Sequence, residues 1–159
     1  MQIRVYYEDT DCGGILYHTN YIKYCERARS ELFFLRKMLP SQANAGFVLS
    51  SLQAQFLGFA RLGDTLEVRS KILKIGKVQV LLLQEIFKIS NLCVLDSNTS
   101  NNESNMLAES RQDVSKQQPE KKIFSAQVRL GYVDVVSQKP MPIPKHLEKI
   151  FLELGSGTH

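Results

Sequence analysis

The feature that most constrains the fold of this chain is a single change of hydrophobic period near Pro40. Before this proline, apolar side chains recur every three or four residues from Tyr21 to Leu39, which is the pattern of an amphipathic helix. After it, apolar and polar side chains alternate along most of the chain, as in strands with one buried face. Because no helix separates these strands, the order predicts an α+β domain with one long helix on an antiparallel sheet.

The long helix is expected from about Asn20 to Met38. Thr19 and Asn20 carry side chains that accept hydrogen bonds from the free N–H groups of a first helical turn, so either residue is a candidate N-cap. Pro40 cannot continue the helix because it has no N–H group. The residues that follow, 40–46, have the composition of a linker.

The strands are predicted from alternation and from turn residues. A first strand is expected over residues 2–7, where Ile3, Val5 and Tyr7 would share the buried face. Later strands are expected at 47–56, 65–75, 78–89 and 123–135, followed by a short helix at 145–154. A tight turn at 75–77 joins two of these strands as antiparallel neighbours.

The chain has 159 residues, which suits one domain with a substantial core. We predict a single domain over 1–154 and a flexible tail at 155–159. Residues 91–122 are polar, rich in Ser, Asn and Gln, and without periodicity, so they are predicted to be a disordered insertion between two strands.

Composition excludes several classes of function. No apolar run approaches the ~20 residues that span a bilayer, so no integral membrane segment is expected. The net charge of +4 comes without a dense basic cluster, which argues against nucleic-acid binding. The N-terminus lacks the pattern of a signal peptide, and three cysteines form no zinc-binding spacing or disulfide framework. These features predict a cytoplasmic protein.

The segment "DTDCGG", residues 9–14, stands directly before the long helix and allows three interpretations. It resembles the DxD motif of magnesium-dependent phosphatases, but the preceding strand is half polar and no downstream acidic pair follows. It also has the composition of a structural turn. In the third interpretation, a carboxylate faces a substrate carbonyl that the positive end of the helix polarises.

A longer pattern favours the third interpretation. Residues 5–32, "VYYEDTDCGGILYHTNYIKYCERARSEL", resemble the signature of hotdog-fold acyl-CoA thioesterases of the 4-hydroxybenzoyl-CoA thioesterase-like family, in particular its Tol-Pal-associated branch. "LGD" and "LKIGKVQVLLLQEI" also fit, so the resemblance covers roughly 3–90 and 123–150. It implies a hotdog fold, an antiparallel sheet wrapped around one long helix, and dimers that often form tetramers with sites at the subunit interface.

The resemblance also implies roles for individual residues. Asp11 matches the catalytic carboxylate, acting either as general base on water or as nucleophile on the acyl carbon. The thioester carbonyl would accept a backbone N–H near Tyr17 or His18. The His18 side chain would orient water or substrate, or be a hydrogen-bonded turn residue. Tyr7 would lie beside the carboxylate, or be a core aromatic, and Asp9 would be structural.

No metal or cofactor is expected beyond the coenzyme A moiety of the substrate. Its phosphates would suit Lys74, Lys77 and Arg61, although lysines in a hairpin are commonly only solvated. Cys12, adjacent to the catalytic position, would need a lowered pKa to act as a nucleophile and is not assigned that role.

The resemblance leaves two rival functions. A hotdog protein can instead bind an acyl carrier protein or another lipid-pathway partner with little hydrolysis. Hydratases and dehydratases share the fold, but they use a histidine and an acid in a different motif. We therefore expect hydrolysis of acyl-CoA to free acid and coenzyme A.

Overall fold

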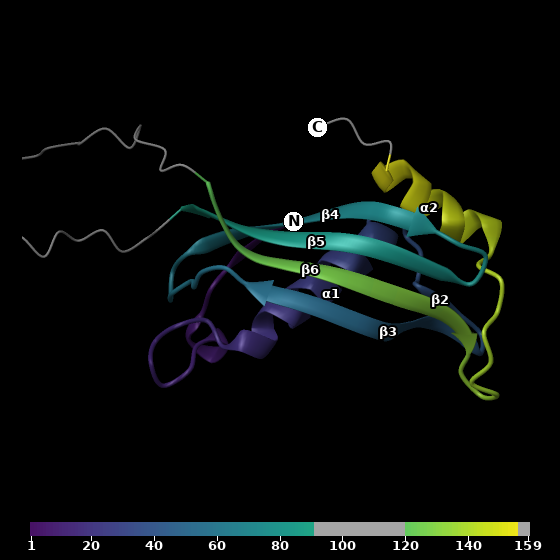
Figure 1. The fold of residues 1–159 in the computed structure, drawn as a ribbon, viewed down its shortest axis with the longest axis horizontal. Helices are drawn as coiled ribbons and strands as arrows, with labels where there is room; N and C mark the ends of the chain where they lie inside the picture. The colour runs from purple at the N-terminus through teal and green to yellow at the C-terminus, as the bar shows by residue number, and fades with distance from the viewer. Residues whose placement is uncertain (91–119, 156–159) are drawn as a thin grey trace, which may run out of the picture.

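The computed structural model describes residues 1–90 and 120–155. In this part, one antiparallel sheet curves around a long helix (Figure 1). The strands are β1 (Gln2–Arg4), β2 (Ser41–Gln42), β3 (Ala45–Phe56), β4 (Thr65–Ile75), β5 (Gln79–Ser90) and β6 (Lys121–Asp134). The helices are the 3₁₀ turn η1 (Tyr7–Asp9), α1 (His18–Phe34) and α2 (Lys145–Gly155).

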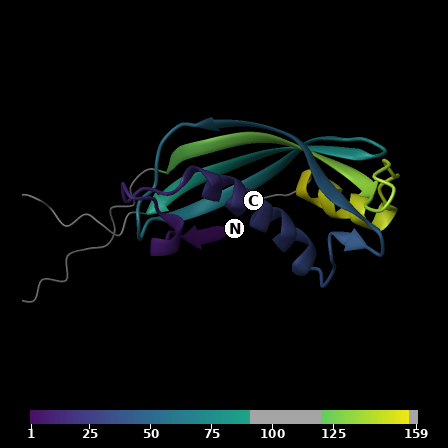
Figure 2. The ribbon, with the colours of Figure 1, turned by 90° about the horizontal axis from the view of Figure 1, so that it is seen from below.

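The sheet has the strand order β1-β4-β5-β6-β3-β2, and every described pairing within it is antiparallel. Figure 2 shows α1 lying along one face of this sheet, with α2 beyond one end of α1. Apart from the first strand, the predicted strands are found to within two residues at each end. The predicted α+β class, with one long helix against consecutive antiparallel strands, is therefore confirmed.

The core lies between the sheet and α1, because alternate side chains of each long strand point at the helix. On β6, the predicted buried face is confirmed for Phe124, Ala126, Val128, Leu130 and Tyr132, which are all buried. Each of these residues faces the same side because successive side chains alternate across a strand. The core is thus continuous from one end of β6 to the other.

The ends of α1 differ from the prediction. The helix begins at His18, and its N-cap is Tyr17, whose side chain makes no capping hydrogen bond, so neither Thr19 nor Asn20 is the cap. It ends at Phe34, six residues before Pro40. The chain leaves the helix through a turn in which Lys37 adopts a positive φ of 55°, and positive φ cannot belong to a right-handed helix.

The first strand is also shorter than predicted. β1 stops at Arg4, and Tyr7 opens the 3₁₀ turn instead of lying on the buried face. The Tyr7 side chain is 81% exposed, whereas Val5 is buried. The prediction was too long because apolar and polar residues keep alternating through Tyr7, although the strand ends at Arg4.

The predicted insertion at 91–122 mostly lies outside the described residues, as do Cys93 and residues 156–159 of the predicted tail. Its predicted end is wrong by two residues, because Lys121 and Lys122 already belong to β6. There they pair with the end of β5.

The two ends of the sheet are chemically different. At one end, the loop before α1 packs on the segment after β3, where the Leu16 N–H donates to the Ala60 carbonyl at 2.9 Å. At the other end, Phe151 of α2 makes edge contacts with Phe33 at 5.6 Å and with Phe47 at 5.2 Å between ring centroids. This aromatic cluster closes the space between α1 and the sheet at the α2 end.

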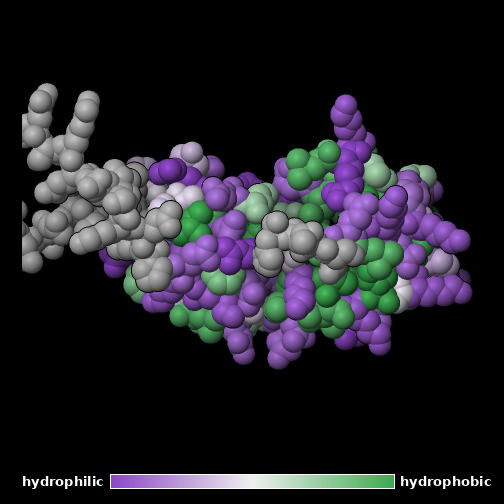
Figure 3. All heavy atoms as spheres, turned by 90° about the horizontal axis from the view of Figure 1, so that it is seen from above, coloured by the Kyte–Doolittle hydropathy of each residue, from purple (hydrophilic) through white to green (hydrophobic). Residues whose placement is uncertain are grey.

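Figure 3 shows a mosaic surface in which hydrophilic side chains cover most of the view and hydrophobic ones gather toward the end that carries α2. Among the described residues, no helix is long and apolar enough to cross a membrane.

Candidate active site

The loop that carries "DTDCGG" is folded into a narrow antiparallel turn against the start of α1. The Asp11 N–H donates to the Ile15 carbonyl at 2.9 Å, and the Tyr17 N–H donates to the Asp9 carbonyl at 2.9 Å. These two bonds, with the Thr10–Leu16 bridge between them, join the Asp11 loop to Tyr17, the residue directly before the helix.

The Asp11 carboxylate is half-buried and oriented by its own loop. Its Oδ1 accepts the Gly13 N–H at 2.8 Å, while its Oδ2 has no partner among the described residues. A Cβ at Gly13 would lie 3.2 Å from that Oδ1, so a side chain here would crowd the carboxylate. Gly14 has a φ of +71°, a conformation that glycine adopts without a steric penalty. Gly13 therefore leaves room for the Asp11 carboxylate, and Gly14 supplies the positive φ of the turn.

The start of α1 supplies backbone donors. In the described part of the chain, the N–H of His18 donates to no acceptor, as expected for the first turn of a helix. The Tyr17 N–H, by contrast, is already taken by the Asp9 carbonyl. Of the two expected oxyanion donors, only His18 has a free amide, and it lies at the positive end of the helix dipole.

The side chains of His18 and Tyr7 are both on the surface of this chain. The His18 ring lies 4.3 Å from the Tyr17 ring, centroid to centroid, and makes no side-chain hydrogen bond to a described residue. Tyr7 is largely exposed, so it is not a core aromatic. Its position beside the Asp11 carboxylate stays a prediction. Both remain free to meet a substrate or a second subunit.

Asp9 is buried and acts as an anchor. Its Oδ2 accepts the Tyr6 N–H at 3.0 Å, and its Oδ1 lies 3.6 Å from the Lys23 ammonium. Burial, together with the adjacent Asp9 carboxylate, raises the pKa of the Tyr24 phenol well above its usual range. Among the described residues, neither Asp9 Oδ1 nor the Tyr24 hydroxyl makes a hydrogen bond, so the ion pair with Lys23 is the contact that Oδ1 keeps.

The three residues expected at the coenzyme are divided between the two ends of the molecule. Arg61 is bridged through its backbone to Ile15 in the Asp11 loop, and its guanidinium lies over the Phe59 ring at 5.4 Å. Lys74 and Lys77 lie at the β4–β5 turn, at the α2 end of the sheet. Within one chain, therefore, only Arg61 is close to Asp11.

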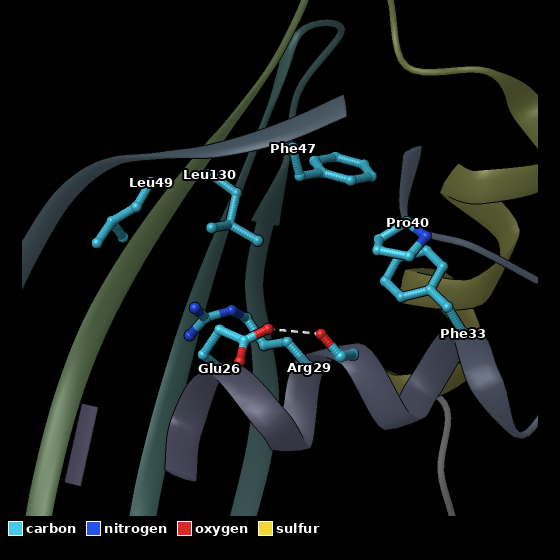
Figure 4. Close-up of a pocket in the computed structure, with 8 residues that line it drawn as sticks. Glu26, Arg29, Phe33, Pro40, Phe47, Leu49 and Leu130 are labelled. Atoms are coloured by element: carbon cyan, nitrogen blue, oxygen red, sulfur yellow. Dashed lines mark hydrogen bonds between the residues drawn. The ribbon is translucent and has the colours of Figure 1, made fainter. Parts of the chain in front are cut away.

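Sequence reasoning missed two features near these positions. Lys74 shares a hollow of about 220 Å³ with Arg129 of β6, which no local sequence signal could link to it because the two are far apart in the chain. A second pocket of about 210 Å³ lies between α1 and β3, with Glu26, Arg29 and Ser30 on its helix wall (Figure 4). The spacing of these three residues, all within one turn, is a signal that could have found them.

The second pocket, which we call the α1–β3 pocket, has one polar and one apolar wall. On the polar wall, the Ser30 hydroxyl donates to the Glu26 carboxylate at 2.6 Å. Arg29 donates to the buried Gln84 at 2.6 Å and pairs with no described carboxylate within 4.0 Å, and its burial lowers the pKa of its guanidinium. The apolar wall is formed by Phe33, Pro40, Phe47, Leu49 and Leu130.

Neither described cysteine has the environment of an activated nucleophile. Burial raises the pKa of the Cys25 thiol to about 12, and Cys12 is exposed. Among the described residues, no three His, Cys, Asp or Glu side chains form a group that could hold a metal ion.

The sequence matches the thioesterase superfamily model over residues 13–94. It is 39% identical over 160 residues to an acyl-CoA thioesterase named YbgC from Helicobacter pylori, an alignment that covers 99% of this chain and all of that protein. It is 36% identical over 93 residues to the acyl-CoA thioester hydrolase YbgC from Escherichia coli, covering 56% of this chain and 69% of that protein.

Solved structures support the same fold. A 1,4-dihydroxy-2-naphthoyl-CoA thioesterase from Synechocystis superposes with a TM-score of 0.71 at 17% identity, covering 97% of this chain and 95% of that one. A probable thioesterase from Bartonella henselae gives a TM-score of 0.61 at 22% identity, covering 91% and 96%. The expected hotdog fold, a curved antiparallel sheet around one helix, is thereby confirmed.

Proposed function

The chain belongs to the thioesterase superfamily and is an acyl-CoA thioester hydrolase, and from this premise we propose that Asp11 carries its chemistry. The observation that supports this most strongly is that, among the described residues, Asp11 Oδ2 and the His18 N–H at the start of α1 both lack a hydrogen-bond partner. The carboxylate can attack the acyl carbon or activate a water molecule, and the N–H group can polarise the thioester carbonyl.

In the proposed reaction, the thioester oxygen accepts the His18 N–H and gains negative charge as the acyl carbon is attacked. A donor of this kind typically contributes ~3 kcal/mol to transition-state stabilisation. Asp11 either removes a proton from the attacking water or attacks the carbon itself to give a mixed anhydride, which water then hydrolyses. Both routes release the free acid and coenzyme A, and neither requires a cofactor.

The side chains around this pair have supporting roles in the proposal. His18 orients the attacking water or the substrate, since its ring is free of hydrogen bonds to described residues. Tyr7 covers the substrate from the loop side. Both surfaces become enclosed when a second copy of the chain binds.

We propose a homodimer in which two copies of β3 pair, because β3 has an open edge. β6 occupies one side of β3, and on the other side β2 pairs only with Ala45 and Gly46. An unpaired strand edge carries free N–H and C=O groups and is a template for another strand. Apolar side chains near this edge are exposed by 40% to 52%, namely Val48, Leu49, Phe56, Leu57 and Phe59.

Two-fold antiparallel pairing at this edge determines which groups meet. The Phe56 end of β3 lies at the Asp11 side, because Phe56 contacts Tyr21 in the first turn of α1 at 5.4 Å. The Phe47 end lines the α1–β3 pocket. In an antiparallel pair these ends come side by side, so each Asp11 would face the α1–β3 pocket of the partner.

We propose that this pocket receives the acyl group. For scale, a cavity of ~150 Å³ holds benzene, so about 210 Å³ accommodates a substituted ring or a short chain. Phe33 and Phe47, backed by Phe151, would limit its length. Named relatives act on acyl-CoA and on an aromatic acyl-CoA, and this pocket is compatible with both classes.

The same pairing gives a role to the coenzyme residues. Arg61 lies at the Asp11 end of its own chain, whereas Lys74 and Lys77 lie at the α2 end. Pairing across β3 would bring the partner's α2 end alongside Asp11. We therefore propose that Arg61 and the partner's two lysines contact phosphates of one coenzyme A. Pairs of dimers would assemble further into homotetramers.

Three finer assignments are also part of the proposal. The "YHTNY" and "ERAR" motifs support placement in the Tol-Pal-associated branch. Cys12 and Cys25 are free cysteines, which is compatible with the reducing conditions of a cytoplasmic location. An acyl carrier protein is a candidate alternative donor of the thioester, since it would present the same bond to the site.

The test is an assay of thiol release from a panel of acyl-CoAs, comparing the wild type with Asp11→Asn. Glu8→Gln, which changes an exposed acid three residues away, is the matched control. We expect turnover to be lost only in Asp11→Asn. Turnover that survives in Asp11→Asn would contradict the assigned role, and binding of acyl carrier protein without turnover of any thioester would favour the binding-partner function.

A further inference from the structure

We propose that Asn20 is a positioning residue, which fixes the start of α1 so that the His18 amide faces the thioester. This inference rests on the proposed function of Asp11 and His18. Asn20 is only 7% exposed although it lies in the first helical turn. Buried amide side chains need hydrogen-bond partners, so the position of its partner is informative.

That partner is the main-chain carbonyl of Asp9. The Asn20 Nδ2 donates to this carbonyl at 2.8 Å, in a buried contact that spans the whole Asp11 loop. The same carbonyl accepts the Tyr17 N–H at 2.9 Å. A carbonyl oxygen has two lone pairs, so both acceptor positions of Asp9 are used by the start of the helix.

These two bonds decide which amide of the helix is left for a substrate. Because Tyr17 donates to Asp9, its N–H points back into the loop, and His18 presents the first free N–H. The Tyr17 N–H gives the start of the helix its first hydrogen bond to the Asp9 carbonyl. Asn20, one helical turn further, supplies the second contact and so fixes the orientation of the turn relative to Asp9.

The Asp9 carbonyl is held in place because the Asp9 side chain makes contacts of its own. Its carboxylate accepts the Tyr6 N–H at 3.0 Å and lies 3.6 Å from the Lys23 ammonium. Asp11 is only two residues from this anchor. Asn20 therefore acts on the distance between the Asp11 carboxylate and the His18 amide through Asp9, and makes no hydrogen bond with Asp11 itself.

The test compares steady-state kinetics of Asn20→Asp, which is isosteric but loses the donor, and Asn20→Leu, which is apolar and of similar volume. Misplacement of about 1 Å near the chemistry can cost ~10²-fold in rate. We expect kcat to fall about ten- to hundred-fold with KM changed less than about three-fold. Asn44→Asp, the same change at an exposed asparagine at the α2 end, should leave both values unchanged.

Hydrogen exchange gives a second readout that overall stability does not mimic. In both Asn20 variants, the Tyr17 amide should exchange faster than in the wild type, while amides in the middle of α1 keep their protection. Asn20→Ser, a milder change that keeps a hydroxyl donor, should lie between wild type and Asn20→Leu in kcat, and it allows the test if the other variants fold poorly.

The outcomes separate the inference from the proposed function. Unchanged kcat in the Asn20 variants, or a loss that appears only in KM, would overturn the positioning role while Asp11→Asn remains inactive. Wild-type turnover by Asp11→Asn would instead overturn the proposed function on which the inference rests.

Discussion

At the residue scale, the two acids of the "DTD" motif differ by environment and not by sequence. Asp9 is 3% exposed and its carboxylate is used to hold the Tyr6 N–H and Lys23, whereas Asp11 is more exposed and keeps one oxygen free. Only the second carboxylate can approach a substrate without breaking the loop. The proposed catalytic role of Asp11 depends on this free oxygen.

Gly13→Ala should lower turnover more than stability. The added Cβ would lie 3.2 Å from Asp11 Oδ1, closer than ordinary van der Waals contact, so the carboxylate must move. We expect kcat to fall about ten-fold or more, with a change of less than about 1 kcal/mol in the free energy of unfolding because the loop is exposed. The measurement is kcat together with urea unfolding.

Gly131→Ala is the matched control for this change. Its Cβ would meet Val133 and Val48 at an ordinary 3.9 Å in β6. Equal losses of kcat in the two variants would show that crowding of Asp11 is not the cause.

At the scale of elements, α1 is held by the side chains it buries against the sheet, and Cys25 is one of them. Burial raises the pKa of this thiol to about 12, against an ordinary value of about 8.5. The folded protein therefore keeps a proton that the unfolded chain releases. The contribution of the buried Cys25 thiol to the free energy of unfolding is fully present below about pH 8.5, and it is lost as the pH rises from there toward 12.

Cys25→Ala should remove this part of the alkaline loss. Urea unfolding at pH 8 and pH 10 would show a smaller fall in the free energy of unfolding for the variant than for the wild type, even though the variant starts lower because of its cavity. Parallel pH dependence in the two proteins would contradict the assignment of this loss to Cys25.

Phe151→Ala should detach α2 from the end of the sheet. Phe151 is fully buried between Phe33 and Phe47, and truncation of a buried phenylalanine typically costs 3–5 kcal/mol. Phe34→Ala removes a ring that is 49% exposed and should cost far less. Chemical unfolding of both variants measures this, and similar losses would show that the aromatic cluster does not anchor α2.

Much of this element structure could be predicted from the sequence, because long periodic segments define their own type. The strands at 65–75 and 123–135 and the helix at 145–154 are found almost as predicted. The two ends of α1 could not be predicted. Its cap is a backbone arrangement at Tyr17 without a side-chain signal, and its early end leaves Leu35 and Leu39 exposed although they continue the helical spacing.

Some features of the candidate site could be predicted from the sequence, and others could not. The motif identified Asp11 and the start of the helix, since both are local in sequence. The roles of the Asp9 carbonyl and of Asn20 depend on a hydrogen bond across the loop. The α1–β3 pocket requires residues of two elements to come together in space, which periodicity does not specify.

At the scale of the whole molecule, the exposed edge of β3 and the separation of Lys74 and Lys77 from Asp11 have one common explanation. In the proposed dimer, pairing at β3 would cover this edge and bring the Asp11 end of one chain beside the α2 end of the other. Two copies would then form two sites, each built from one Asp11 loop and the partner's α1–β3 pocket.

The most direct test of this account mixes two inactive variants. Asp11→Asn removes the acid, and Ser30→Trp fills the α1–β3 pocket from its α1 wall. If acid and pocket come from different subunits, co-refolding equal amounts should restore about one quarter of the wild-type activity, because half of the dimers are mixed and each has one intact site. If the mixture remains as inactive as its components while mixed dimers form, the site does not span two subunits and the account is wrong.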